Sequence, residues 1–153
     1  MEIFVLSRSR AVQYCDTPHK RPSVMVSICT PYEEYDGHEI HISSQNNIKK
    51  ILHLEFYDCE YGALERGAVK EYELMTDDDA IHVVTFCKTA IEQYGDIDII
   101  VHCDAGISRS AGVAAAIMQY YLGDDSEIFD SGMYRPNMWC YRKTMNAFEK
   151  GAE

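Results

Sequence analysis

Two residues of this sequence, Cys103 and Arg109, have side chains and a spacing that could do chemistry. A cysteine reacts as its thiolate, and a nearby guanidinium or helix N-terminus favours that charged form. A guanidinium also holds two oxygens of a tetrahedral oxyanion through parallel hydrogen bonds. The pair therefore predicts a nucleophilic sulfur beside a group that binds an anion.

Two neighbours in the sequence are candidates to support the sulfur. Ser110 has a hydroxyl that can donate a hydrogen bond to a thiolate, and His102 can hydrogen-bond the backbone that holds Cys103. For His102 alone, a packed histidine with satisfied hydrogen bonds is an equally good interpretation. Both residues are included in the predicted site.

A strand, a bend and a helix are expected to position these residues. The apolar run Ile97–His102 predicts a buried strand, Gly106 marks a bend, and the small and apolar residues of Arg109–Leu122 predict a helix. The first N–H groups of a helix lack intrahelical partners and carry partial positive charge. The bend is therefore predicted to bind an anion through its backbone as well.

The other apolar runs alternate between strand and helix patterns. Strands are expected at Ile3–Leu6, Val24–Ile28 and Ile51–Phe56, the first followed by a polar turn or short helix. Helices are expected at Ala80–Ile91, with Cys87 in the core, and from Arg135-Pro136-Asn137 to about Lys150. This order predicts one α/β domain over residues 1–153, with a central, mainly parallel sheet flanked by helices on both faces.

The composition restricts the partners of the chain. Hydrophobic residues make up 46% of it, which suits a sizeable core, and its formal net charge is -11. Nucleic acids and anionic membranes are not expected as partners, because such surfaces repel an acidic protein. Any affinity for an anion must then be local and come from the bend and Arg109.

The six cysteines are spread without close pairs, which indicates neither a zinc ribbon nor a disulfide framework. The first residues do not have the charge and apolar length of a signal peptide, and no later run is long enough to cross a bilayer. A cytoplasmic location, which keeps Cys103 a free thiol, is the simplest expectation. His38 and His41 have no further clear ligands, so a surface strand or loop is expected there and no metal site.

The run from His102 to Ser110 resembles the phosphate-binding loop of the cysteine-dependent protein tyrosine phosphatase superfamily, with Cys103, Gly106 and Arg109 at matching places. Its Gly-Ile-Ser-Arg-Ser ending is similar to that of the dual-specificity branch. The resemblance extends from about residue 51 to the C-terminus. It implies a phosphatase-like three-layer sandwich in which the phosphate is bound by Asp104, Ala105, Gly106, Ile107, Ser108 and Arg109.

The resemblance also implies a reaction that uses no metal and no cofactor. Cys103 would attack phosphorus to form a cysteinyl-phosphate, and an aspartate after an upstream strand would be the general acid. Asp58 matches that position, although the stretch 60–76 looks like an insertion that places it farther from Cys103 than in compact members. The competing group, Asp77-Asp78-Asp79, follows Thr76 and has the pattern of a helix start, where acids act as caps.

The implied substrate is a phosphorylated protein or a small phosphomonoester, with phosphotyrosine first and phosphoserine or phosphothreonine as further candidates. Lipid and polyphosphate phosphatases of the superfamily tend to carry basic residues inside the loop, whereas this loop has Asp104. Two alternatives remain open. One is a phosphate-binding module without turnover; the other is a sulfur-transfer or arsenate-reducing enzyme with Cys59 as a resolving cysteine.

Overall fold

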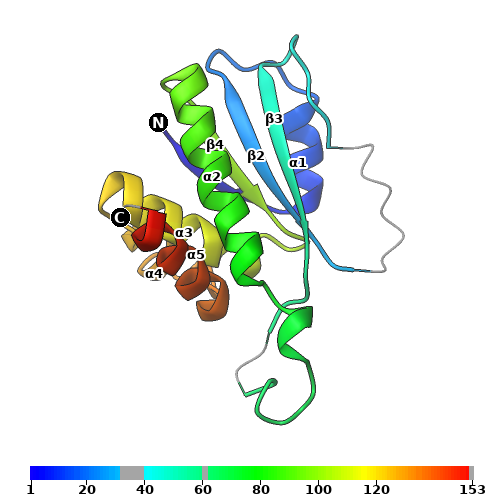
Figure 1. Cartoon of the computed structure of the whole chain (residues 1–153). Helices are drawn as coiled ribbons and strands as arrows, with labels where there is room; N and C mark the ends of the chain where they lie inside the picture. The colour runs from blue at the N-terminus through cyan, green and yellow to red at the C-terminus, as the bar shows by residue number, and fades with distance from the viewer. Residues whose placement is uncertain (32–39, 60–61, 152–153) are drawn as a thin grey trace.

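The computed structural model describes residues 1–31, 40–59 and 62–151. Its centre is a four-stranded sheet built from β1 (Ile3–Leu6), β2 (Ser23–Cys29), β3 (Ile48–Glu55) and β4 (Asp98–His102) (Figure 1). The strands lie in the order β1-β4-β2-β3, and every described pair is parallel. The carboxyl ends of all the strands therefore meet at one edge of the sheet.

Helices cover both faces of the sheet (Figure 1). One face carries α1 (Arg8–Cys15), and the other carries α2 (Asp77–Tyr94), α3 (Arg109–Leu122) and α5 (Met138–Gly151). Two short elements, the 3-10 helix η1 (Glu71–Glu73) and α4 (Ser126–Phe129), lie in the connections. The predicted α/β domain with flanking helices is confirmed.

The side chains of β2 alternate between the two faces. Val24 and Val26 lie in the larger core under α2, α3 and α5, whereas Met25 packs with Ala11 of α1 on the opposite face. Both faces of β2 are covered, so side chains on both faces are buried. This explains why the strand has a continuous apolar run.

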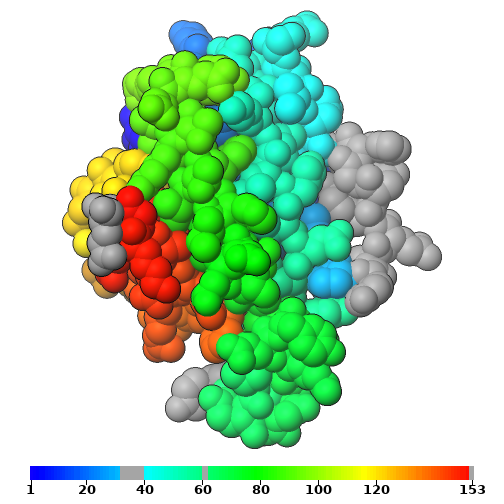
Figure 2. Space-filling model, in the orientation of Figure 1, coloured from blue at the N-terminus to red at the C-terminus, as the bar shows by residue number. Residues whose placement is uncertain are grey.

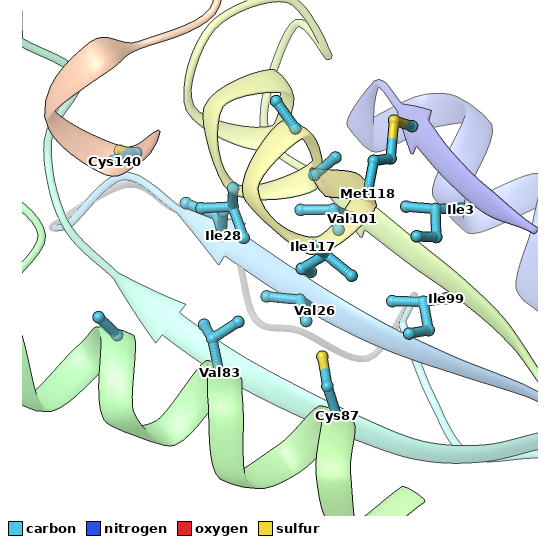
Figure 3. Close-up of a cluster of buried hydrophobic side chains, with 14 of the residues drawn as sticks. Ile3, Val26, Ile28, Val83, Cys87, Ile99, Val101, Ile117, Met118 and Cys140 are labelled. Atoms are coloured by element: carbon cyan, nitrogen blue, oxygen red, sulfur yellow. The ribbon is translucent and has the colours of Figure 1, made fainter. Parts of the chain in front are cut away.

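The larger core joins the sheet to α3 and α2. In Figure 3, Val26, Ile99 and Val101 of the sheet lie close to Ile117 of α3, and Cys87 of the neighbouring helix α2 points toward the same cluster. Cys87 is fully buried, as predicted. The packed layer holds β4 and the start of α3 in a fixed relation, and the bend of interest lies between those two elements.

Small residues allow α3 and α5 to approach each other closely. A side chain at Gly112 of α3 would overlap the backbone carbonyl oxygen of Asn137 and lie 3.2 Å from Cβ of Cys140. Asn137 immediately precedes α5, so this contact fixes the start of that helix against α3. The small-residue pattern of α3 is thus explained by packing.

The ends of α2 agree with the sequence patterns. The Thr76 hydroxyl accepts a hydrogen bond from the Asp79 N–H at 3.1 Å, and Asp79 Oδ2 accepts one from the Thr76 N–H at 2.9 Å. This reciprocal pair is a capping box. Gly95, with φ +77°, ends the helix.

Some details differ from the expected elements. The segment after β1 is the helix α1, begun by Ser7 as N-cap, which is one of the two forms expected there, whereas the one-turn helix α4 had no counterpart among the expected elements. His38 lies outside the described residues, while His41 is exposed in a loop. In the described ranges, no three His, Cys, Asp or Glu side chains are grouped so that they could hold a metal ion. Nor does any described helix combine the length and apolarity needed to cross a membrane.

Candidate active site

The carboxyl ends of the four strands supply groups to one region. β4 ends at His102 and continues directly into Cys103 and the loop. Gly106 of this loop packs on the backbone after β1, Thr30 follows β2, and Phe56 and Asp58 follow β3. This is the edge at which parallel α/β sheets bind ligands.

Cys103 and Ser110 are in direct contact. Their Sγ and Oγ atoms are 3.0 Å apart, and the Cys103 side chain is only 3% exposed. Ser110 lies in the first turn of α3 and is fully buried, so water is excluded as a hydrogen-bond partner of its hydroxyl and the sulfur takes that place. A hydroxyl that donates to a thiolate stabilises the charged form.

His102 is buried behind the cysteine and makes two hydrogen bonds. Its Nδ1 is 3.3 Å from the carbonyl oxygen of Cys103, and its Nε2 is 2.6 Å from Oγ of Ser27. A carbonyl can only accept, so Nδ1 donates and Nε2 accepts from the Ser27 hydroxyl. Burial lowers the pKa of His102 to about 4, which keeps the ring neutral at pH 7. His102 therefore orients the backbone of Cys103 as a neutral group.

The loop between β4 and α3 presents its backbone as a set of donors. In the described part of the chain, no N–H from Asp104 to Ser108 donates a hydrogen bond to a protein acceptor. Gly106 has φ +71°, and a Cβ there would lie 2.6 Å from the backbone of Leu6 and Ser7. Only glycine meets both constraints without strain. The loop thus places N–H donors without protein acceptors at the N-terminus of a helix, an arrangement that suits an anion.

Arg109 is buried and held by two acceptors. One guanidinium nitrogen donates to the Phe56 carbonyl oxygen at 2.8 Å, and the other donates to Asp104 Oδ2 at 3.1 Å. That Asp104 oxygen also accepts from the Thr30 hydroxyl at 2.8 Å. A guanidinium has five N–H donors, so these two bonds fix its plane and leave donors for a ligand.

Asp58 lies next to the loop. Its Oδ1 accepts hydrogen bonds from the Ser108 hydroxyl at 2.8 Å, the Asn137 side-chain amide at 2.7 Å and the Cys59 N–H at 3.1 Å. Oδ2 accepts none within the described residues. The intervening segment therefore leaves Asp58 in contact with Ser108, the loop residue directly before Arg109.

The competing acidic group has other partners. Asp79 caps α2, and Asp77 is exposed and pairs with Lys143 at 2.8 Å, a contact that lowers the pKa of Asp77. Within the described residues, no hydrogen bond or ion pair of Asp77, Asp78 or Asp79 reaches the loop. The cluster thus has the structural use that its sequence pattern indicates.

Three supporting residues were not among the predicted site residues. Ser27 bonds His102, Thr30 bonds Asp104, and Asn137 bonds Asp58 while its backbone N–H donates to the Ser108 carbonyl at 3.0 Å. Asn137 also accepts from the Cys140 N–H at 3.0 Å, which caps α5. The Pro-Asn pair ahead of the last helix is the signal that could have identified Asn137.

The other cysteines near the site are poor thiolates. Burial raises the pKa of Cys59 and of Cys140, and nearby Asp58 adds to both effects. All six cysteines are free thiols. Cys103 is therefore the cysteine placed beside the predicted anion cradle.

Comparison with solved structures identifies the fold as that of dual-specificity and related cysteine-dependent protein tyrosine phosphatases. Human DUSP28 is similar with a TM-score of 0.55 and 15% identity, over 98% of this chain and 93% of that one. The human tyrosine phosphatase-like serine/threonine/tyrosine-interacting protein has a TM-score of 0.53 and 17% identity, over 86% and 80% of the two chains.

A fungal structure extends the likeness. The Yvh1 phosphatase domain from Chaetomium thermophilum has a TM-score of 0.53 and 14% identity, over 98% of this chain and 90% of that one. No protein-family model matches the chain, and no curated protein matches its sequence. At these identities the likeness establishes the fold, and the chemistry has to be argued from the site.

Proposed function

We propose that residues 1–153 form a catalytic domain that hydrolyses phosphomonoesters on proteins through a cysteinyl-phosphate. One juxtaposition supports this most strongly: Cys103 Sγ lies 3.0 Å from Ser110 Oγ beside a loop whose described N–H groups have no protein acceptor. Arg109 adds a buried positive charge at the same place. A thiolate and an oxyanion cradle are what phosphoryl transfer to sulfur requires.

In the first step, the Cys103 thiolate attacks phosphorus and the bond to the leaving oxygen breaks. The loop N–H groups and Arg109 hold the three equatorial oxygens, where negative charge spreads in the transition state. Asp58 donates its proton to the leaving oxygen. The Asp58 Oδ2 atom suits this role, because Oδ1 is engaged by Ser108 and Asn137 whereas Oδ2 accepts no hydrogen bond from a described residue.

In the second step, Asp58 is a carboxylate and takes a proton from water. The water oxygen attacks phosphorus, the S–P bond breaks, and the electron pair returns to sulfur as the thiolate. Ser110 donates its hydrogen bond to the leaving sulfur and so makes it a better leaving group. Inorganic phosphate then leaves, and the site returns to its starting state.

The substrate class follows from the charges around the loop. The Asp104 carboxylate lies beside Arg109 in the loop. Its negative charge and the net charge of -11 both repel ligands that carry several phosphates. PTPMT1, a structural neighbour with a TM-score of 0.51, is in complex with PI(5)P in its solved structure, so a lipid is the competing class. A single phosphate on a tyrosine, serine or threonine side chain fits this loop better.

The test is the hydrolysis of phenyl phosphate between pH 5 and 8 in the native protein, Cys103→Ser and Asp58→Asn. We expect no turnover with Cys103→Ser and a fall of about 100-fold or more with Asp58→Asn, together with loss of the basic limb of the pH profile. Asp78→Asn is the matched control, because it removes one carboxylate of the competing cluster, and we expect native rates.

Two results would overturn the proposal. Equal rates in the native protein and Cys103→Ser would show that Cys103 is not the nucleophile. Phosphate binding without hydrolysis by the native protein would favour the binding module instead.

A further inference from the structure

A groove of about 620 Å³ lies beside the loop. Ser108 and Asn137, the two partners of Asp58, line the groove where it meets the candidate site. Leu64 and Glu65 line it from the segment 62–76, and Figure 2 shows that segment as a separate green projection next to the orange start of α5. The groove therefore begins at the proposed acid and continues away from the loop.

Two arginines give the groove its charge. Arg135 and Arg142 both line it, and both are exposed. Within the described ranges, neither guanidinium makes a hydrogen bond or an ion pair. Glu65 is the one acidic residue among the described lining residues, so this part of an acidic protein carries an excess positive charge.

The wall beside the arginines is apolar and fixed. Met138 and Trp139 line the groove at the start of α5, and the Trp139 Nε1–H donates to the Met75 carbonyl oxygen at 2.9 Å. An aromatic ring held in this way offers a rigid surface to an extended chain. The groove thus combines apolar contact with two cationic groups.

We propose that this groove binds the residues next to the phosphorylated side chain of a protein substrate, and that Arg135 and Arg142 select an acidic group there. This inference rests on the proposed function, because it assumes that the scissile phosphate occupies the loop. The acidic group is a carboxylate or a second phosphate, since either can accept from a guanidinium. Binding of this acidic group by the two arginines would make the protein selective for phosphorylated sites in acidic sequences.

The test measures the binding of labelled phosphotyrosine peptides to the Cys103→Ser protein, which separates binding from turnover. One peptide has glutamates on both sides of the phosphotyrosine, a second has glutamines, and a third has one glutamate replaced by phosphoserine. We expect the glutamate peptide to bind about tenfold more tightly than the glutamine peptide, as two exposed charge pairs allow. A further gain with the third peptide would assign the second phosphate as the preferred group.

Arg135→Gln/Arg142→Gln in the Cys103→Ser background should abolish that ratio. Lys20→Gln/Lys150→Gln is the matched control, because it removes two exposed positive charges elsewhere and should keep the ratio. A ratio retained by the arginine variant, or lost equally in both variants, would overturn the proposal. So would equal binding of the glutamate and glutamine peptides.

Two further results separate this inference from the proposed function. The native protein could fail to hydrolyse phenyl phosphate while the Cys103→Ser protein still shows a glutamate preference that depends on the arginines. That combination would support the groove as a binding site and contradict the proposed turnover. If the arginine variant instead lost affinity only for vesicles that contain phosphatidylinositol phosphate, the groove would be a lipid site and the proposal would be wrong.

Discussion

His102 lies directly before Cys103, the proposed nucleophile, and its ring is held between the Ser27 hydroxyl and the Cys103 carbonyl. Within the described residues, no carboxylate is in hydrogen-bond contact with the His102 ring, and burial lowers its pKa to about 4. An unfolded chain would restore the ordinary value of about 6.5. Between these two values the unfolded chain takes up a proton that the folded chain does not, so stability must fall as the pH is lowered.

We predict that this one group removes about 3 kcal/mol of stability between pH 6.5 and pH 4, and that its contribution is constant above pH 7. Urea unfolding of the native protein and of His102→Gln, measured at several pH values, tests this. The variant should show a shallower decline towards acid pH. Parallel pH profiles would mean that folding leaves the pKa of His102 at its unfolded value.

Asn137 joins two functions in one side chain. Its amide nitrogen donates to Asp58, and its amide oxygen accepts from the Cys140 N–H. It does not contact the reacting atoms in the proposed mechanism, so it is a positioning residue. Its removal should act on the protonation of the leaving group through Asp58.

We predict that Asn137→Ala slows the hydrolysis of phenyl phosphate about tenfold and that of p-nitrophenyl phosphate much less, because p-nitrophenolate leaves without a proton. Loss of the cap should also lower the free energy of unfolding by about 1 kcal/mol. Asn137→Asp keeps an oxygen for the cap but places a carboxylate against Asp58 Oδ1, so it should be slow and should also lose stability through like-charge repulsion. Equal slowing for both substrates would contradict a role through Asp58.

At the scale of elements, the site depends on how α3 and α5 cross. Gly112 lets the backbone before α5 approach α3, and the same backbone carries Asn137 to Asp58. A change in how α3 and α5 cross should therefore displace Asn137 and so alter the position of Asp58, while the loop itself stays unchanged.

We predict that Gly112→Ala lowers the free energy of unfolding by about 2 kcal/mol and also lowers kcat for phenyl phosphate. Gly123→Ala is the control, because a Cβ there meets no atom within 4 Å and the cost, about 1 kcal/mol, comes from its φ of +71° alone. This control should keep its kcat. Urea unfolding and steady-state rates of both variants check this, and native activity in Gly112→Ala would contradict the coupling.

The elements themselves were largely predictable because their signals are local. The four apolar runs became parallel strands, and α2 begins after Thr76, as its sequence pattern predicted. What was missed are contacts between residues far apart in the chain, such as Ser27 with His102 and Asn137 with Asp58. Periodicity reports on neighbours in sequence and carries no information on which distant side chains meet.

In the whole molecule, a group of stabilising ion pairs lies at the edge of the sheet opposite the candidate site. At the amino ends of the strands, opposite the loop, Asp98 Oδ1 accepts from the Glu2 N–H at 3.1 Å and pairs with Arg21 at 2.7 Å. Asp96 nearby pairs with the Met1 amino group at 2.7 Å but is far more exposed. These contacts join three chain segments and touch no candidate site residue.

We predict that Asp98→Asn lowers the urea midpoint while kcat for phenyl phosphate, measured well below the unfolding temperature, stays native. Asp96→Asn should lower the midpoint less, because exposed pairs contribute little. A fall in kcat of Asp98→Asn under conditions where it is fully folded would show that the two edges of the sheet are coupled.

Transfer of the phosphoryl group to Cys103 can be observed by rapid quenching of Asp58→Asn mixed with p-nitrophenyl phosphate, followed by mass spectrometry of the protein. The good leaving group allows the first step without an acid, whereas the second step lacks its base, so the intermediate should accumulate. We predict one phosphoryl group on Cys103 at the time when p-nitrophenolate appears, and none with Asp58→Asn/Cys103→Ser. Release of p-nitrophenolate with no modified cysteine, or with the phosphoryl group on another residue, would contradict the account.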